Sequence, residues 1–425
     1  IQRGSIITSD GVTLAESLQQ EDGTYARSYP NGNMAAHVVG YVSQQYGTAG
    51  IETVMNDTLT GSKDYSSWNN AIASLAGQTQ PGNTAKLTID SRIQTAAEQA
   101  LKGFKGAVVV IDPRTGAVLA CASSPTYDNT NIDALLQAGG GEDGSMYNRA
   151  MDALYTPGST FKVVTLSAAL ETGTASLTST YQAPGSMDIG NAPVTNYANE
   201  SYGTISLQQA FAVSSNVVFG QVATEVGANT LVQFANAFGY GQKLGQDLTS
   251  AASIMADPSL MTEWETAWAG AGQPVGMDHT PGPQTTVMQN AVIAAAIANS
   301  GVVMDPYFVA QVLAPDGTVV KTTQSRSLGQ AVSSATADQV KQAMLAVVQS
   351  GTGTDAQIPG VKVAGKTGSP ETGGTNVNST FVGFAPYDSP TVAISVALED
   401  YDKHDVKAAK IAGIVLTAAL AAQGA

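Results

Sequence analysis

The segment that most constrains the fold is residues 156–162, with the sequence TPGSTFK, because it places a serine and a lysine three residues apart where an apolar helical pattern begins. Pro157 suits the first helical position, and apolar residues then recur every three or four positions until Gly173 ends the pattern. Residues i and i+3 share a helix face, so we expect the Lys162 amine to reach the Ser159 hydroxyl. An isolated pair of this kind is usually a serine near a helix N-terminus with a lysine on the solvated face. The pair alone is therefore weak evidence for catalysis, and other motifs in the chain are needed.

Composition excludes several classes of function. The 34 acidic residues outnumber the 19 basic ones and give a net charge of -15, without any Lys/Arg-rich run, so nucleic-acid and anionic-membrane partners are disfavoured. The histidines His37, His279 and His404 are isolated from one another, which leaves little support for catalytic zinc or for a Ser/His/Asp triad. We therefore expect no metal and no cofactor, and if a serine is activated, a lysine is the natural base.

Length predicts two domains, since 425 residues exceed one typical domain. The single cysteine, Cys121, excludes an intrachain disulfide and lies in an apolar run, as a buried small side chain would. The best apolar run, residues 411–422, is shorter than the roughly 18 residues of a membrane span and predicts a packed helix. The chain starts at Ile1 instead of methionine, so we expect a signal or membrane anchor upstream of it.

Residues 1–85 predict a small accessory domain. Two short apolar runs flank Asp10-Gly11, which is the pattern of a strand, a tight turn and a second strand. The chain is then polar and weakly periodic, and a linker-like segment rich in Gly, Gln and Thr follows at 77–84. We assign residues 86–425 to a second, larger domain.

Residues 86–425 show clear helix and strand patterns. Asp90 suits the N-cap of a helix that places Ile93, Ala97 and Leu101 on one face. Further helices are expected at 207–211, from about 217, and at 287–300, 337–348 and 406–422, and strands at 106–111, 117–122, 361–369, 380–385 and 391–398. The first two strands, joined by the turn sequence DPRTG, should pair antiparallel, and residues 123–149 should form a loop. Strands at both ends with helices between them predict an α/β mixed fold with one mixed sheet in which the two ends meet.

One glycine-rich pattern fits the dinucleotide motif GxGxxG at Gly139, Gly141 and Gly144. In nucleotide-binding proteins that motif follows a strand and opens a helix. No strand pattern precedes it here, and Glu142 and Asp143 would repel a pyrophosphate. The segment is therefore interpreted as a loop.

Residues 360–367 spell the phosphate-loop motif GxxxxGKT letter for letter. A phosphate loop must follow a strand and open a helix, whose N-terminus holds the phosphates. Here residues 361–364 alternate as a strand within the motif, and Pro370 and Gly373-Gly374 follow where a helix would have to grow. The context argues against a nucleotide hydrolase.

Three short motifs follow one another along the chain, each weak alone and specific as an ordered set: Ser159 with Lys162, Ser214 with Asn216, and Lys366-Thr367-Gly368. This set resembles the S-x-x-K, S-x-N and K-T-G motifs shared by penicillin-binding proteins and serine β-lactamases. Further segments over nearly the whole chain resemble class B penicillin-binding proteins: RGSI at 3–6, AHVVGY at 36–41, GIE at 50–52, LTIDSRIQ at 87–94, IDPRTGAVLA at 111–120, ANSG at 298–301 and FVGFAP at 381–386. The short region before residue 87 is most similar to the compact penicillin-binding protein A subgroup of Gram-positive actinobacteria.

The resemblance implies a penicillin-binding transpeptidase fold, with an antiparallel sheet flanked by helices and an all-helical lobe, beside a small N-terminal pedestal or dimerisation-like domain. It implies a peptidoglycan D,D-transpeptidase that attacks D-Ala-D-Ala stem peptides, releases D-Ala, passes the acyl group to an amine and is acylated by β-lactams. The expected partners are stem peptides on a lipid-linked precursor or nascent glycan, β-lactam antibiotics, and division or elongation proteins. The expected location is the outer face of a bacterial cell membrane, with an N-terminal anchor helix outside this sequence. No glycosyltransferase domain fits in the available residues, which disfavours class A.

The resemblance also implies a role for each motif residue. Ser159 would be the nucleophile and Lys162 its base, which requires burial and a neighbouring cation, Lys366, to lower the pKa of Lys162. Ser214 would relay a proton to the departing amine, and Asn216 would hold a substrate amide. Without the resemblance, Ser214 and Asn216 could simply cap the next helix, and Lys366 could be a solvated strand lysine.

The KTG strand would bind the substrate. Lys366, Thr367 and Ser369 would bind its carboxylate, and Gly368 would leave room for the peptide to lie along the strand. The backbone N–H groups of Ser159 and Ser369 would form the oxyanion hole.

Two features depart from the family pattern or leave alternatives open. Residues 270–284 are longer than the tight GQG segment that the family usually shows. Glu263 and Glu265 follow the SxN motif at an interval similar to that of the deacylating glutamate of class A β-lactamases, although without that family's surrounding motif. A β-lactamase or carboxypeptidase and a non-enzymatic penicillin sensor therefore stay as alternatives, while a division scaffold that uses residues 1–85 is compatible with the enzyme.

Overall fold

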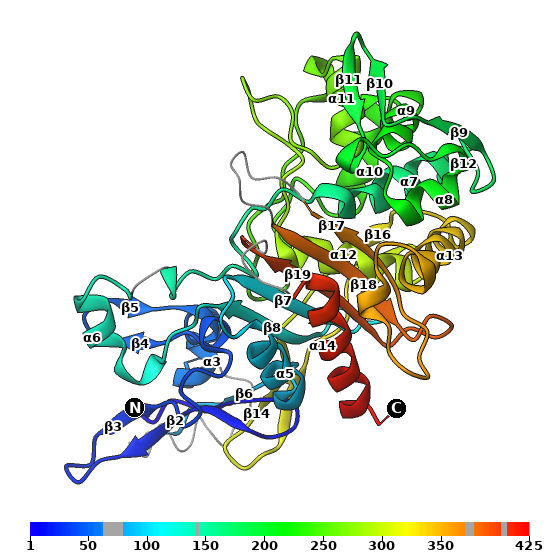
Figure 1. The fold of residues 1–425 in the computed structure, drawn as a ribbon. Helices are drawn as coiled ribbons and strands as arrows, with labels where there is room; N and C mark the ends of the chain where they lie inside the picture. Colours follow the sequence, from blue (N-terminus) through cyan, green and yellow to red (C-terminus); the bar gives the residue numbers. More distant parts are fainter. Residues whose placement is uncertain (63–79, 142–143, 370–377, 401–405, 425) are drawn as a thin grey trace.

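The computed structural model describes residues 1–62, 80–141, 144–369, 378–400 and 406–424, and its centre is a five-stranded sheet in the order β17-β18-β19-β7-β8 (Figure 1). The strands are β7 (Gly106–Ile111), β8 (Val118–Ser124), β17 (Ala364–Gly368), β18 (Ser379–Ala385) and β19 (Val392–Leu398). Because β19 pairs with β7, segments far apart in sequence meet in one sheet, as predicted. Every neighbouring pair is antiparallel, so the expectation of a mixed sheet from the residue pattern was wrong. Short turns join β7 to β8 and β18 to β19, and such turns connect antiparallel strands only.

Helices cover both faces of the central sheet. Val108 and Val110 pack in one apolar cluster with α5 (Ser91–Leu101) and α14 (Ala408–Ala422), while the alternate residues of β7 pack in a second cluster with α12 (Val287–Ala298). This alternation follows from the two-residue period of a strand. All residues of β18 and β19 are consequently buried, so the sheet forms a rigid support for the segments at its edge.

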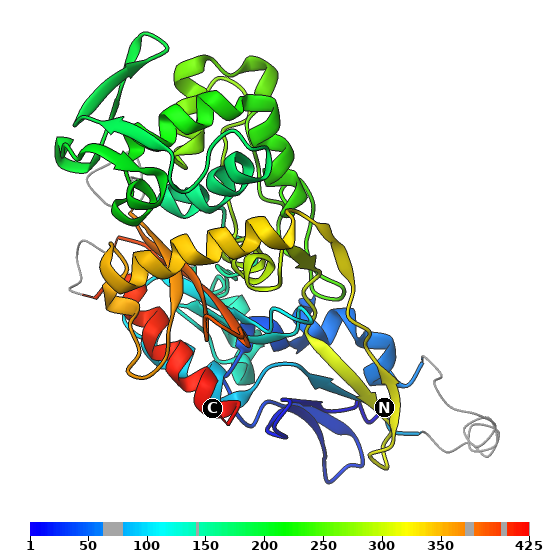
Figure 2. The same ribbon diagram turned by 90° about the vertical axis from the view of Figure 1, so that its right-hand side faces the viewer.

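A mainly helical lobe lies beyond the β17 edge of the sheet (top of Figure 1). Its helices are α7 (Lys162–Glu171), α8 (Leu207–Val213), α9 (Asn216–Val226), α10 (Ala228–Ala237) and α11 (Glu263–Gly270). The lobe also carries two small two-stranded sheets, one of β9 (Thr180–Ala183) with β12 (Gly203–Ser206), the other of β10 (Ser186–Ile189) with β11 (Ala192–Thr195). The long helix α13 (Ser334–Ser350) runs between the lobe and the sheet and packs against α7, α8 and β17 (Figure 2).

A second, six-stranded sheet joins the start of the chain to a distant hairpin. It has the order β15-β14-β6-β1-β2-β3. Its strands are β1 (Ile6–Ile7), β2 (Thr13–Gln19), β3 (Tyr25–Ser28), β6 (Thr84–Leu87), β14 (Val309–Leu313) and β15 (Val319–Thr322). The predicted strand, turn and strand around Asp10-Gly11 is confirmed by β1 and β2. No pattern in the sequence indicates that β14 and β15 extend this sheet, because only the folded chain brings them beside β6.

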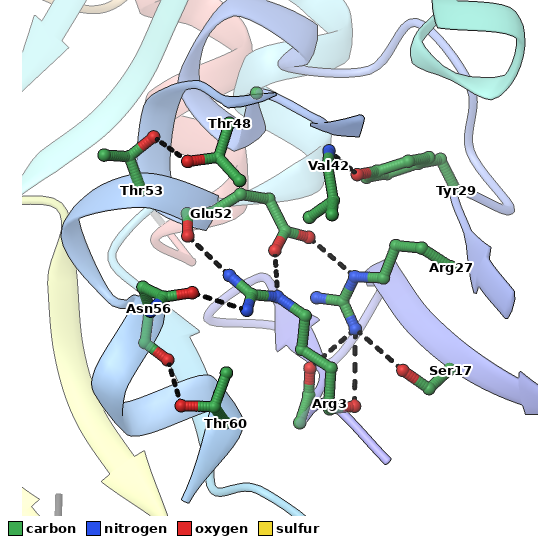
Figure 3. A network of polar contacts seen from close by, with 12 residues as sticks. Arg3, Ser17, Arg27, Tyr29, Val42, Thr48, Glu52, Thr53, Asn56 and Thr60 are labelled. Carbon is green, nitrogen blue, oxygen red and sulfur yellow. Dashed lines mark hydrogen bonds and ion pairs between the residues drawn. The ribbon is translucent and has the colours of Figure 1, made fainter. Parts of the chain in front are cut away.

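A buried carboxylate ties the beginning of the chain together (Figure 3). Glu52, in α2 (Gly50–Val54), accepts hydrogen bonds from Arg3 Nε at 2.5 Å and from Arg27 Nε at 2.6 Å. Arg3 also donates to Asn56 Oδ1 at 2.8 Å. The RGSI and GIE segments, forty-odd residues apart in the sequence, therefore meet in one ion network.

The remaining helix and strand predictions are confirmed with small shifts at their ends, including the Asp90 cap, whose side chain accepts from the N–H groups of Arg92 and Ile93. The loop predicted at residues 123–149 was wrong, because the described part of this range contains the end of β8 and helix α6 (Ile132–Gln137). A six-residue helix without a side-chain cap is too short to leave a periodic pattern. The predicted linker 77–84 lies partly outside the described residues, and its last residue begins β6. In the described parts of the chain, no helix is long and apolar enough to span a membrane.

Candidate active site

Ser159 lies in a tight turn that leads into helix α7. The turn is a 3-10 helix, Gly158–Phe161, and α7 follows directly from Lys162. Gly158 has a φ of 58°, a left-handed conformation that favours glycine. The three-residue spacing places Lys162 Nζ 2.9 Å from Ser159 Oγ, which confirms the contact expected from the sequence.

The turn between α8 and α9 brings Ser214 and Asn216 to the same amine. Lys162 Nζ lies 3.1 Å from Ser214 Oγ, 3.0 Å from the Ser214 carbonyl oxygen and 2.8 Å from Asn216 Oδ1. Ser214 has φ 64° and ψ 46°, a conformation uncommon for a residue with a side chain and one that tends to occur at functional sites. Ser215, rather than Ser214, caps α9, since its side chain accepts from the Val218 N–H.

Lys366 reaches the site from strand β17. Its Nζ lies 3.0 Å from Ser214 Oγ and 3.0 Å from the carbonyl oxygen of Thr367. Gly368 allows β17 to approach the nucleophile turn, because a Cβ there would lie 3.0 Å from the Pro157 carbonyl oxygen and 3.3 Å from the Ser159 nitrogen. Room for this turn is thus one reason for a glycine at 368, beside the room for a substrate expected from the sequence.

The two lysines form a buried pair of like charges. Lys162 and Lys366 are both 0% exposed. Burial, followed by the positive charge of Lys366, holds the pKa of Lys162 well below its usual range. Burial lowers the pKa of Lys366 to about 7. Within the described ranges, neither amine forms an ion pair with a carboxylate.

The partners of Lys162 suit a neutral amine that can accept a proton. A neutral amine has two N–H donors and one lone pair, and a carbonyl or amide oxygen can only accept a hydrogen bond. The Ser214 carbonyl and Asn216 Oδ1 can take both donors. The lone pair is then left for the hydroxyl hydrogen of Ser159, 2.9 Å away. The arrangement can therefore make an alkoxide-like nucleophile of Ser159 without a histidine.

Comparisons with known proteins cover nearly the whole chain. Residues 106–419 match the family described as penicillin binding protein transpeptidase domain, and residues 3–85 match the penicillin binding protein A dimerisation domain. The chain belongs to the penicillin-binding protein family of peptidoglycan D,D-transpeptidases. The predicted family and enzyme class are confirmed.

Individual relatives support the family over long alignments. The chain is 33% identical to the peptidoglycan D,D-transpeptidase PbpA of Mycolicibacterium smegmatis, over 94% of this chain and 84% of that protein. A crystal structure of a D,D-transpeptidase domain from Eggerthella lenta is 44% identical, covers 100% of this chain and 99% of that one, and has a TM-score of 0.90. The penicillin G acyl-enzyme of penicillin-binding protein A from M. tuberculosis is 31% identical with a TM-score of 0.88, covering 99% of both chains.

The penicillin-binding fold explains why the nucleotide motifs fail. Residues 365–367 lie within β17, and the Lys366 amine points to Ser214, so the GKT letters open no helix for a phosphate. The Gly139 pattern follows helix α6 instead of a strand. Among the described residues, no group of three or more His, Cys, Asp or Glu side chains could hold a metal ion.

The glutamates weighed as deacylating groups have other partners. Glu265 forms a capping box with Thr262 at the start of α11, and its Oε2 accepts from the Gly276 N–H at 3.0 Å. Glu263 is in the first turn of the same helix. Nothing in these contacts links either carboxylate to Ser159.

Residues outside the three sequence motifs also support the candidate active site. Asn196 is buried, and its Oδ1 accepts from Ser215 Oγ at 2.8 Å and from the Val217 N–H at 3.0 Å. Asn216 Nδ2 donates to the carbonyl oxygen of Thr195 at 3.1 Å. The loop after β11 therefore supports the SxN turn. A single Asn in a polar loop carries no signal in a lone sequence.

Proposed function

We propose that this penicillin-binding protein cross-links peptidoglycan by acyl transfer through Ser159. The observation that carries the proposal is the buried Lys162 amine, 2.9 Å from Ser159 Oγ and beside a second buried lysine. A lysine with a pKa held well below its usual range can serve as the general base near neutral pH. The reaction then runs in two steps, acylation and transfer.

In acylation, Lys162 takes the proton of Ser159, and Oγ attacks the carbonyl carbon between the two D-Ala residues of a stem peptide. The backbone N–H groups of Ser159 and Ser369 are assigned to stabilise the oxyanion that forms. The C–N bond then breaks, and the proton from Lys162 passes through Ser214 to the leaving D-Ala amine. The short Lys162, Ser214 and Lys366 contacts, each about 3 Å, support this route.

In transfer, the amine of a second stem peptide attacks the acyl carbon and loses a proton to Lys162. The bond from the acyl carbon to Ser159 Oγ then breaks, and Lys162 returns the proton to that oxygen. Asn216 is assigned to hold a substrate amide, and Lys366, Thr367 and Ser369 to bind the substrate carboxylate. Thr367 is half-buried and Ser369 is exposed at the end of β17, where a ligand can reach them. A β-lactam would acylate the same oxygen, and slow hydrolysis of this adduct is what a transpeptidase predicts.

We assign residues 1–85 to an accessory domain and residues 86–425 to the transpeptidase domain. The matches at 3–85 and 106–419 support this division. Hairpin β14–β15 crosses it, which would hold the two domains together through one sheet. The family matched by residues 3–85 is described as a dimerisation domain. Sedimentation of the full chain over a range of concentrations tests whether residues 3–85 mediate self-association.

We further propose that the protein works on the outer face of the cell membrane, held by an anchor helix outside this sequence, together with division or elongation proteins. The support is that the relatives are named as peptidoglycan D,D-transpeptidases. Fractionation of cells that carry the full gene product tests the location.

Intact-mass spectrometry with benzylpenicillin tests the central proposal. The expected result is one covalent adduct per chain that persists for many minutes and is absent from Ser159→Ala. Rapid loss of the adduct with hydrolysed drug would indicate a β-lactamase, and no adduct would contradict the assignment of Ser159. Product analysis with an added D-amino acid separates a transpeptidase, which forms the transfer product, from a carboxypeptidase, which releases only the free acid.

A further inference from the structure

The segment after helix α13 touches both motif-bearing walls of the active site. The Thr352 N–H donates to the carbonyl oxygen of Ala212 at 3.2 Å, and Ala212 lies in α8 two residues before Ser214. The Thr352 hydroxyl lies 2.5 Å from the hydroxyl of Thr367 in β17. Thr352 therefore connects the SxN turn with the KTG strand, although it belongs to neither motif.

The position of Thr352 is fixed by its backbone. Both flanking glycines, Gly351 and Gly353, donate from their N–H groups to the carbonyl oxygen of Val347 at 3.0 Å, at the end of α13. A Cβ at Gly351 would lie 2.5 Å from the Ala212 carbonyl oxygen, so only glycine allows this approach. The Thr352 side chain is exposed, yet it is held at a set place beside Thr367.

The direction of the hydrogen bond between the two hydroxyls decides what Thr367 can offer a ligand. A threonine hydroxyl has one hydrogen to donate and two lone pairs that accept. If Thr352 donates to Thr367, the hydrogen of Thr367 is free to point to a ligand. If Thr367 donates to Thr352, that hydrogen is used up. An incoming carboxylate, which can only accept, selects the first arrangement, and the resulting chain of hydrogen bonds strengthens each member.

We propose that Thr352 is a positioning residue for the substrate carboxylate: its hydroxyl donates to the Thr367 hydroxyl and thereby directs the Thr367 hydrogen to the carboxylate. The inference rests on the proposed function, in which Thr367 contacts the carboxylate. It adds a residue outside the three motifs that discriminates ligands with a free carboxylate from ligands without one.

The test compares two thioester substrate analogues, one ending in a free carboxylate and one in which a methyl group, which cannot accept a hydrogen bond, replaces the carboxylate. Thr352→Val keeps the shape of the side chain and removes the donor. We expect kcat/KM for the carboxylate analogue to fall roughly threefold to tenfold through KM, since one hydrogen bond to a charged-group network is lost. The methyl analogue should react equally with both proteins, and Thr352→Ser should restore the carboxylate preference. Thr354→Val, an exposed threonine on the same segment, serves as the matched control and should change neither rate.

Three results would overturn the inference: an equal loss for both analogues, no loss for either, or no rescue by Thr352→Ser. An equal loss would mean that Thr352 supports the wall structurally without orienting Thr367. Thr367→Val separates this failure from failure of the proposed function. If Thr367→Val keeps its preference for the carboxylate analogue, the assignment of Thr367 to the carboxylate is wrong, whatever Thr352 does.

Discussion

Glu52 and Lys162 are both completely buried, but Glu52 lies between two guanidinium groups whereas Lys162 lies beside another lysine. In the N-terminal network the carboxylate has a charged partner on each oxygen, Arg3 at 2.5 Å and Arg27 at 2.6 Å. Among the described residues, the Lys162 and Lys366 amines contact only neutral oxygen atoms, and the Ser214 hydroxyl contacts both amines. The buried charge of Glu52 is thus compensated by opposite charges, whereas the buried amine of Lys162 has no opposite charge beside it among the described residues.

The difference separates what stabilises the fold from what activates it. Opposite charges offset one another's loss of hydration, and removal of one partner leaves the others buried and unpaired. Like charges add to the free-energy cost of burial. This destabilises the charged form of the lysine in the folded protein, and the lysine pKa is therefore lowered. Substitutions at Glu52 should therefore affect stability and leave chemistry intact, and substitutions at Lys162 should do the reverse.

The largest effect is expected for Lys162→Met. Loss of the base should lower the second-order rate of acylation by benzylpenicillin roughly 10²- to 10⁴-fold. The melting temperature should stay equal or rise, because an uncompensated buried amine is replaced by an apolar side chain of similar length. Stopped-flow or mass-spectrometric acylation rates and thermal unfolding measure both quantities, with Lys410→Met, at an exposed lysine, as the control. A clearly lower melting temperature would show that Lys162 stabilises the fold and would break the comparison.

The next effect is expected for Glu52→Gln, which leaves two arginines without a counter-charge. Breaking a buried pair in this way costs about 3–5 kcal/mol of unfolding free energy. Below its melting temperature the variant should still be acylated at close to the parent rate, since the network is remote from Ser159. Glu21→Gln, at an exposed glutamate, should change neither property. An acylation rate more than tenfold lower in a fully folded Glu52→Gln protein would connect the network to the chemistry.

The dependence of stability on pH distinguishes the two clusters further, through Lys366→Met. In the parent protein the folded pKa of Lys366 is lowered to about 7, below that of the unfolded chain. Between about pH 7 and 10 the unfolded state therefore holds a proton that the folded state has lost, and the stability of the parent rises with pH. Lys366→Met has no such proton. Its gain in unfolding free energy over the parent at pH 7 should therefore shrink as the pH rises and the parent becomes more stable. Urea unfolding of both proteins at several pH values measures this, and an advantage independent of pH would mean that Lys366 titrates normally.

The sequence was most informative where function depends on local spacing. The three-residue interval between Ser159 and Lys162 puts both side chains on one helix face, and the expected contact between them is confirmed. The alternating strand pattern at 361–369 also placed Lys366 on a strand and argued against the phosphate loop. The meeting of all three motifs around the Ser214 hydroxyl was expected only from the family resemblance, because no local pattern shows which distant segments meet.

What escaped prediction depends on contacts between distant segments. Hairpin β14–β15 completes the N-terminal sheet only because residues 84–87 offer it an edge in the folded chain. Thr352 gains its partner Thr367 through the packing of α13 against β17, and Asn196 gains Ser215 through the fold of the lobe. Their own sequence neighbourhoods are ordinary. Helix α6 escaped for a different reason, since six residues are too few for a period to show.

The smallest effect is expected for Arg27→Lys, and it tests whether the Glu52 network acts as one unit. Arg27 donates to Glu52 and, at 2.8 Å, to the Gly4 carbonyl oxygen, while its Nη2 has no hydrogen-bond partner in the part of the chain that the structure describes. A lysine keeps the charge and loses the planar fork, so the expected loss is about 1 kcal/mol, well below that of Glu52→Gln. In the double variant Arg27→Lys/Glu52→Gln, the loss of unfolding free energy should be smaller than the sum of the two single losses, because the two residues share one interaction. Strict additivity in urea unfolding would mean that Arg3 alone compensates Glu52, and the contrast with the lysine pair would then rest on a single ion pair.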